Sequence, residues 1–407
     1  MLLLSNPVRA YAWGRPDGFS TLLGTEPSGG PEAELWVGTH PGAPSVVVAG
    51  DPLAVGRTLA EVIAEDPSRW LGPELAAKGW TALPYLLKVL AVGAPLSLQA
   101  HPTAEQAEAG FAREEAAGVP LDHPARTYRD RGAKPEALVA LDDTWALCGF
   151  RPAGEAVALV DALGVDGLAP VLERLRGPDP LHRALEWLLR LDRDRSRSLA
   201  DEVGAAVAPD PAAWLDADDP GGESTARAWV ARVSAAFPAD ALAIAPLLCQ
   251  VIHLVRGEAV HLPAGNLHAY LSGAGVEIMA ASDNVLRGGL TPKHVDVEEL
   301  LAILRFEPGV PAGPAAVALG DGIVGYDAHE AAFALAEVTS GDAVRTLVPG
   351  GPSLLLATGG DVDVAGADGG VELGAGAAAF VGPDDGELTV SGPGTLWWAM
   401  PGDALAR

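Results

Sequence analysis

The chain has 407 residues, 49% hydrophobic and 20% charged, which allows roughly two or three domains and argues against bulk disorder. Its formal net charge of -27 argues against nucleic acid as a partner, because such binding depends on lysine and arginine contacts to phosphates. No apolar run approaches the roughly 18 residues that span a bilayer, and the N-terminal leucines are too few for a signal peptide. We therefore expect a cytoplasmic protein with no membrane partner. Cys148 and Cys249 stand alone in apolar surroundings, which is typical of core residues.

The first 150 residues combine short strands, turns and small helices. Thr58 and Glu61 have the spacing of a capping box ahead of an apolar stripe, which predicts the start of a helix. Short helices are also expected at 73–78 and 103–116. The segment 84–102 predicts a strand, a turn at residues 93–95 and a second strand.

The second of these strands has polar and apolar residues in strict alternation. Ser97, Gln99 and His101 alternate with Leu98 and Ala100. Because successive side chains of a strand point to opposite faces, we expect the three polar groups to share one face. Another strand is expected at 137–141.

The rest of the chain divides into a helical part and a glycine-rich part. From about residue 152 to 245 the apolar residues recur at helical spacing, as in Leu181, Leu185 and Leu188. A Pro/Asp/Gly-rich connection, 208–222, interrupts this part. After Pro308, short alternating strands with turns between them predict a small antiparallel barrel or sandwich. They are expected at 353–357, 362–364, 377–381, 387–390 and 395–399.

Four residues form a candidate metal site: Gln99, His101, Glu136 and His268. Gln99 and His101 lie two apart on a strand, Glu136 follows a proline, and His268 follows a turn at a strand start. Two imidazoles, a carboxylate and an amide oxygen suit zinc or a similar divalent ion. The alternative is structural. His101 could cap a strand, Gln99 could bond to the backbone, and Glu136 could form a surface ion pair with Lys134.

Several sequence blocks resemble known families. Gly257, Pro263, Gly265 and His268 have the spacing of the second motif of the cupin superfamily. More specifically, the chain resembles the type I mannose-6-phosphate isomerases through YAWG (11–14), ELWVGTHPGAPS (34–45), PYLLKVLAVGAPLSLQAHP (84–102), KPEALVAL (134–141) and HLPAGNLHAYLSGAGVEIMAASDNVLRGGLTPK (261–293). The resemblance covers the first 300 residues well and the last hundred weakly.

The resemblance implies a fold, an activity and a cofactor. It implies one zinc ion per chain, held by the residues that match the candidate metal set. It further implies interconversion of mannose 6-phosphate and fructose 6-phosphate, with a small phosphosugar as partner, in a monomer serving GDP-mannose metabolism. The expected fold is mainly β, with two cupin-type jelly-roll domains and an α-helical insertion. Its expected parts are a discontinuous catalytic domain (1–151 and 246–308), the insertion (152–245) and a C-terminal jelly roll (309–407).

Other polar residues of these blocks are candidates for catalysis and substrate binding. The family's matching arginine is treated as catalytic, which implicates Arg287 as stabiliser of an enediolate. The expected proton-transfer groups are Glu277 and Lys134, with Asp283 behind them. The expected substrate-binding residues are Trp13, Lys88, Ser97, Tyr270 and Lys293. Core packing is the alternative for the two aromatic residues, and a snorkelling position on an edge strand is the alternative for Lys88.

One departure from the family pattern and two rival functions complete the expectations. The family usually has a histidine directly before the lysine of the Lys-Pro-Glu block, where this chain has Ala133. A cupin dioxygenase with iron is a first rival, against which Gln99 and the nearby cations argue. A sugar-binding cupin without catalytic activity is a second, against which Arg287 and Lys134 argue.

Overall fold

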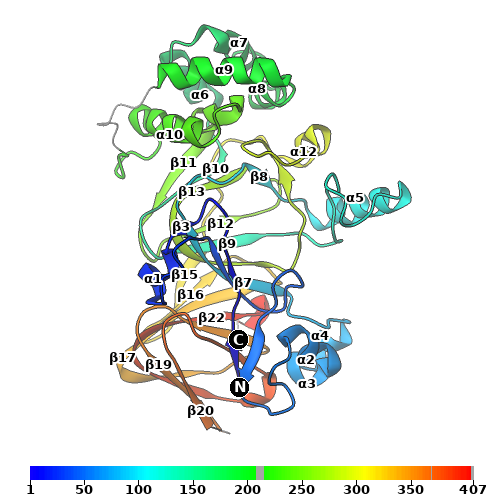
Figure 1. Cartoon of the computed structure of the whole chain (residues 1–407), viewed down its shortest axis with the longest axis vertical. Helices are drawn as coiled ribbons and strands as arrows, with labels where there is room; N and C mark the ends of the chain where they lie inside the picture. Colours follow the sequence, from blue (N-terminus) through cyan, green and yellow to red (C-terminus); the bar gives the residue numbers. More distant parts are fainter. Residues whose placement is uncertain (208–214, 368, 405–407) are drawn as a thin grey trace.

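The computed structural model describes residues 1–207, 215–367 and 369–404 (Figure 1). Two large antiparallel sheets follow one another along the long axis, and a group of helices covers the far end of the first sheet. The protein is therefore mainly sheet with a helical segment, as predicted. Residues 208–214 of the expected connection, 208–222, lie outside the described residues. None of the described helices combines the length and apolar character that a membrane crossing requires.

The first sheet is built from the N-terminal part of the chain and from residues 249–287. Its main path runs in the order β11-β10-β13-β7-β5-β2, and four further strands are attached to it. Its strands are β2 (Val8–Arg9), β5 (Glu34–Val37), β7 (Tyr85–Val92), β8 (Gln99–Ala100), β9 (Glu136–Ala140), β10 (Thr144–Phe150), β11 (Cys249–Leu254), β12 (Ala259–Leu262), β13 (His268–Ala280) and β14 (Leu286–Arg287).

The second sheet contains the C-terminal strands and two strands from the start of the chain. Its main path is β15-β16-β17-β22-β18-β21-β1-β6. Its strands are β1 (Leu2–Ser5), β6 (Val46–Ala49), β15 (Ala315–Gly320), β16 (Ile323–Asp327), β17 (Ala334–Leu347), β18 (Ser353–Ala357), β19 (Val362–Gly366), β20 (Gly369–Leu373), β21 (Ala378–Val381) and β22 (Leu388–Met400). A separate pair consists of β3 (Arg15–Pro16) and β4 (Pro31–Glu32).

The strands differ from the sequence expectations in three places. The predicted strand around residues 96–101 is hydrogen-bonded as a strand only at β8, which is two residues long. The two strands predicted at 387–390 and 395–399 are one long strand, β22, whose pairing with β17 is interrupted by irregularities. Finally, β1 pairs with β21 through Leu2 and Phe380, so the first strand of the chain belongs to the second sheet. Pairing between distant segments leaves no local pattern in the sequence.

The helix after Thr58 begins where the sequence places its cap. The side chain of Thr58 accepts a hydrogen bond from the Glu61 amide at 3.2 Å, and the Glu61 carboxylate accepts one from the Thr58 amide at 2.9 Å. The helices are α1 (Gly18–Leu23), α2 (Leu59–Glu65), α3 (Pro67–Leu71), α4 (Pro73–Ala77), α5 (Ala104–Ala116), α6 (Ala153–Ala162), α7 (Ala169–Leu175), α8 (Pro180–Leu189), α9 (Arg193–Ala206), α10 (Glu223–Ala236), α11 (Ala245–Leu248) and α12 (Val297–Ile303). The helices predicted at 73–78, 103–116 and around Leu181 are therefore confirmed.

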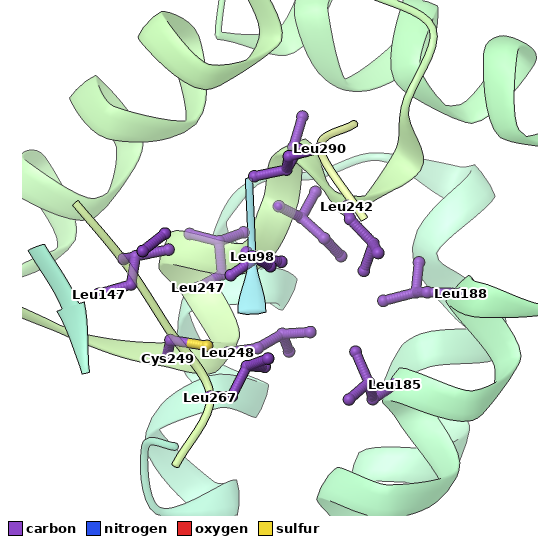
Figure 2. Close-up of a cluster of buried hydrophobic side chains, with 14 of the residues drawn as sticks. Leu98, Leu147, Leu185, Leu188, Leu242, Leu247, Leu248, Cys249, Leu267 and Leu290 are labelled. Carbon is purple, nitrogen blue, oxygen red and sulfur yellow. The ribbon is translucent and has the colours of Figure 1, made fainter. Parts of the chain in front are cut away.

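Two apolar clusters join these layers. Between the sheets, Leu87 and Val89 of β7 are buried in one cluster with Leu354 and Leu356 of β18. Above the first sheet, side chains of the helices converge on the segment that carries β8. Figure 2 shows Leu98 at the centre of this second cluster, among leucines from several elements. The neighbours labelled there include Leu185, Leu188, Leu242, Leu247, Leu267 and Leu290.

Replacing Leu98 by alanine should strongly destabilise the protein. The Leu98 side chain is fully buried, so its truncation leaves a cavity, and such changes cost about 2–5 kcal/mol. Chemical denaturation followed by circular dichroism should show a lower midpoint. The matched control is Leu53→Ala, because Leu53 is 81% exposed and should contribute little. Equal midpoints for the two variants would contradict the central packing role of Leu98.

Candidate metal centre and active site

Three ionisable side chains from three segments meet inside the first sheet. His101, Glu136 and His268 each offer one ligand atom, and these atoms lie within 4.8 Å of one another. Glu136 begins β9 and His268 begins β13, whereas His101 directly follows β8. Gln99 pairs with His268 across the β8–β13 ladder, so the backbones of these two expected ligands lie side by side. The structure thus brings three side chains of the candidate metal set together and places the backbone of Gln99, the fourth residue, beside that of His268.

Both histidines are oriented by the backbone. Nδ1 of His101 lies 2.8 Å from the carbonyl oxygen of Asn284, and Nδ1 of His268 lies 3.0 Å from that of Asn266. A carbonyl only accepts, so each Nδ1 carries the proton and each Nε2 has a free lone pair. Fixing the ring through its other nitrogen is the usual support for a metal-binding histidine.

The two free nitrogens face the carboxylate. Nε2 of His101 lies 3.3 Å from one oxygen of Glu136, and Nε2 of His268 lies 3.5 Å from the other. Within the described part of the chain, both nitrogens are buried without a hydrogen-bond partner. Buried polar atoms are rarely left unsatisfied, so these two indicate a missing ligand between them. Burial lowers the pKa of His101 to about 4, which keeps its ring neutral, as metal binding requires.

Glu136 is buried next to a lysine. The Lys134 ammonium donates a hydrogen bond to Glu136 at 2.5 Å, and their side chains are 10% and 2% exposed. The alternative of a surface ion pair is therefore wrong. A buried carboxylate requires a nearby positive charge of this kind, because burying an unpaired charge costs roughly several kcal/mol.

A second buried group of charged residues lies on neighbouring strands. Lys88 of β7 is directly opposite Glu277 of β13 on one side and Trp36 of β5 on the other. Its ammonium lies 3.6 Å from Glu277 and 3.6 Å from Glu34. β7 is an interior strand, so the edge-strand alternative for Lys88 is wrong. Tyr270 donates a hydrogen bond to Glu277 at 3.0 Å.

This second group perturbs the acidity of its members. Burial, followed by the negative charge of Glu136, raises the pKa of Glu277 to about 7. Burial opposes the charged form of Lys88, but the carboxylates of Glu34 and Glu277 outweigh it and raise the pKa of Lys88 above its ordinary value. A carboxyl group with a pKa near neutrality can take up and release a proton at physiological pH.

Arginine and lysine side chains lie around these two groups. Arg287 of β14 pairs in register with Gln99, and burial, together with the nearby Arg129, lowers its pKa. Burial and the charges of Arg287 and Arg129 also lower the pKa of Lys293. Mutual repulsion of this kind indicates a local positive potential in a strongly acidic chain. Such a potential favours an anion.

The remaining candidates for catalysis and substrate binding are Asp283, Trp13 and Ser97, whose side chains differ in their exposure to solvent. Asp283 pairs with His40 at 3.0 Å, and its side chain is 49% exposed, so it lies outside the buried groups. Trp13 packs against the apolar cluster that contains the buried Tyr270. Ser97 is half-buried and precedes Leu98, whose side chain is in the core.

Sequence reasoning overlooked several residues of this region. Glu34 and Trp36 lie close to Lys88, and Trp36 donates a hydrogen bond to Glu34 at 2.5 Å. The only local signal is their spacing of two residues on β5, which places both side chains on one face of the strand. That this face lies beside Lys88 follows only from the pairing of β5 with β7. Asn284 and Asn266 were missed because they act on the ligands through backbone carbonyls.

The fold and the site define a metal-binding protein of mainly antiparallel sheet with a buried group of polar side chains. A family model described as "Phosphomannose isomerase type I, catalytic domain" matches residues 1–153. The mannose-6-phosphate isomerase of Escherichia coli (strain K12) is 36% identical over 410 residues, covering 97% of this chain and 98% of that protein. The Salmonella typhimurium enzyme of the same name is 37% identical over 316 residues, covering 77% of this chain and 76% of that protein.

Solved structures agree with the sequence relatives. A crystal structure described as mannose 6-phosphate isomerase (holo; zinc bound) superposes with a TM-score of 0.86 at 31% identity, covering 98% of this chain and 99% of that one. The chain belongs to the type I mannose-6-phosphate isomerase family.

Loss of one histidine should abolish metal binding. We expect purified protein to hold one divalent ion per chain, measured by plasma mass spectrometry after gel filtration. His268→Ala should contain little metal, because the site then loses one of its three converging ligand atoms. His329→Ala is the control, since the side chain of His329 is 83% exposed and far in sequence from the site. Metal at the wild-type level in His268→Ala would contradict this site.

Proposed function

We propose that this chain interconverts D-mannose 6-phosphate and D-fructose 6-phosphate through an enediolate, in a reaction that depends on one zinc ion per chain. The observation that carries the proposal is the convergence of His101, Glu136 and His268 next to a buried carboxyl group, Glu277, whose pKa is raised to about 7. Membership of the family supplies the substrate. The reaction would serve mannose and GDP-mannose metabolism.

The donor set fits zinc. His101 and His268 offer imidazole nitrogens, Glu136 offers a carboxylate, and Gln99 is the proposed fourth ligand through its amide oxygen. When bound, zinc would polarise the oxygen atoms on the reacting carbons of the sugar. The two orphaned Nε2 atoms are the observation of this structure that supports the fit.

Isomerisation moves a proton between C2 and C1 of the open-chain sugar. The base takes the proton from C2 of mannose 6-phosphate and returns it to C1, while the hydroxyl proton moves from the C2 oxygen to the C1 oxygen. We assign the transfer of the proton between C2 and C1 to Glu277, which is buried and accepts a hydrogen bond from Tyr270. Lys134, next to Glu136, is assigned to ring opening and proton transfer between the oxygens. Asp283 is less suited, because its ion pair with His40 lowers its pKa.

The phosphate and the sugar require separate contacts. Arg287 is fixed in charge and lies in register with Gln99, so we assign it to stabilisation of the enediolate. Lys293 and Ser97 are assigned to the phosphate. Lys88 faces two carboxylates, which makes support of Glu277 a better role for it than phosphate binding. Trp13 and Tyr270 would form the wall against the sugar.

The proposed division of the chain follows the sequence expectations with one addition. Residues 1–151 and 246–308 would form a cupin-type catalytic domain, 152–245 the helical insertion, and 309–407 a second jelly roll. The addition is that β1 and β6 are counted with the second jelly roll, because they pair within its sheet. A monomeric state and a cytoplasmic location stay predictions.

The activity can be tested directly. Purified protein given mannose 6-phosphate should form fructose 6-phosphate, detected through a coupled dehydrogenase assay. A strong chelator should abolish the reaction, and zinc should restore it, because the ligand set alone provides no Lewis acid. Full turnover by protein shown to be metal-free would refute the zinc requirement. Binding of mannose 6-phosphate without turnover would instead support the sugar-binding alternative.

Replacing Glu277 by glutamine should slow catalysis without removing the metal. Glutamine has nearly the same shape and can accept the Tyr270 hydrogen bond, but it cannot carry the proton. We expect kcat to fall by roughly 10²–10⁴-fold with a small change in KM, as for other losses of a general base. Zinc content should be unchanged. Glu173→Gln, on the exposed surface of α7, serves as the control. Unchanged kcat in Glu277→Gln would leave Lys134 or Asp283 as the base.

A further inference from the structure

A buried asparagine connects two segments that are about 150 residues apart. Asn284 is completely buried. Its side-chain oxygen accepts hydrogen bonds from the amides of Arg129 at 2.7 Å and Asp130 at 3.2 Å. Its side-chain nitrogen donates to the carbonyl oxygens of Asp130 and Gly132, both at 2.9 Å, and to Oδ1 of Asp130 at 3.2 Å. One side chain therefore satisfies four backbone groups of the loop 129–132.

The backbone of the same residue holds a metal ligand. The carbonyl oxygen of Asn284 accepts the hydrogen bond from Nδ1 of His101 that leaves Nε2 free. The loop 129–132 leads after two residues to Lys134 and after four to Glu136. Asn284 thus lies between His101 on one side and the segment of Glu136 on the other.

We propose that Asn284 is a positioning residue that sets the distance between His101 and Glu136 by fastening the loop 129–132 to the carbonyl that orients His101. The inference rests on the metal centre proposed above and adds a residue to its support. Because a backbone carbonyl moves with its own residue, the five side-chain hydrogen bonds also fix the position of the carbonyl that His101 uses.

The chemistry of the site requires an amide at this position. The loop presents two N–H groups and two carbonyl groups to residue 284, and an amide side chain matches them with an oxygen that accepts two hydrogen bonds and a nitrogen that donates two. An aspartate would keep the acceptor, lose both donors and face the carboxylate of Asp130. Alanine would leave buried backbone groups unsatisfied, at about 1–3 kcal/mol for each.

Neighbouring residues reinforce the connection. Asp130 accepts a hydrogen bond from Ser282 at 2.8 Å and another from the amide of Asp283 at 2.7 Å. Gly132 also receives a hydrogen bond from Ser282 at 3.2 Å. The segment 282–284 therefore holds the loop through the carboxylate of Asp130 as well as through its backbone.

Asn266 provides a matched comparison within the same site. Its carbonyl orients His268 as that of Asn284 orients His101. Among the described residues, however, its side chain makes one hydrogen bond, which it donates to the sulfur of Cys148 at 3.4 Å. Both alanine variants keep the backbone carbonyl that orients a histidine, but only Asn284→Ala removes a side chain that fastens the loop 129–132. Comparing the two variants therefore isolates the effect of the side-chain hydrogen bonds.

The experiment compares zinc affinity in Asn284→Ala and Asn266→Ala with that of the wild-type chain. Affinity is measured by competition with a chromophoric chelator, and the ligand geometry by the visible spectrum of the cobalt-loaded protein. Asn284→Ala should bind zinc roughly 10–100-fold more weakly, as expected for loss of support to the ligands, and its cobalt bands should shift. Asn266→Ala should differ little from wild type in both measurements.

The outcomes distinguish the inference from its premises. If Asn284→Ala only lowers the melting temperature of metal-free protein, with zinc affinity and cobalt spectrum unchanged, the residue is merely structural and the proposal is overturned. If Asn284→Ala does not fold, Ser282→Ala provides the second variant, with a smaller loss of affinity expected and no loss contradicting the proposal. A wild-type chain that binds no zinc would overturn the metal centre itself, and this inference with it.

Discussion

The site depends on a carboxylate, Glu136, that is kept ionised while almost completely buried. Taking such a group out of water is costly, and the ammonium of Lys134 compensates for the buried charge. The two imidazoles that face Glu136 come from segments that meet it only in the folded chain. Among the described residues, their Nε2 atoms are buried without a hydrogen-bond partner. A carboxylate and two imidazole nitrogens thus converge on one place, and this arrangement suits a bound cation.

Apolar residues give the polar groups their positions. Leu98 directly precedes Gln99, and Leu267 directly precedes His268, and both leucines are buried in the cluster beneath the helices (Figure 2). Because neighbouring residues of an extended chain point to opposite sides, burying each leucine turns the next side chain away from the apolar cluster. The helical segment therefore contributes to the site without placing a ligand in it. The helices pack against Leu98 and Leu267, the residues that directly precede Gln99 and His268.

Features that depend on neighbouring residues in the chain could be predicted from the sequence. The alternation around Gln99, the capping box of Thr58 and the helical spacing around Leu185 were all readable in the sequence, and together with the family resemblance they indicated the metal set. The partners of Lys88 were not readable. Glu34 lies more than 50 residues before it and Glu277 almost 190 after it, and only the order β13-β7-β5 brings them together. The pairing of β1 with the second sheet was missed for the same reason.

Glu136 and Glu277 are buried carboxyl groups whose surroundings move their pKa values in opposite directions. Burial raises the pKa of both, but at Glu136 the charge of the adjacent Lys134 ammonium opposes burial, and the pKa of Glu136 lies well below its ordinary value. At Glu277 the charge of Glu136 adds to burial, and Lys88, which is shared with Glu34, compensates only in part. Two carboxyl groups with different pKa values can be in different protonation states at the same pH and can therefore have different roles. Glu136 stays ionised and suits a cation, whereas Glu277 can exchange a proton near neutrality.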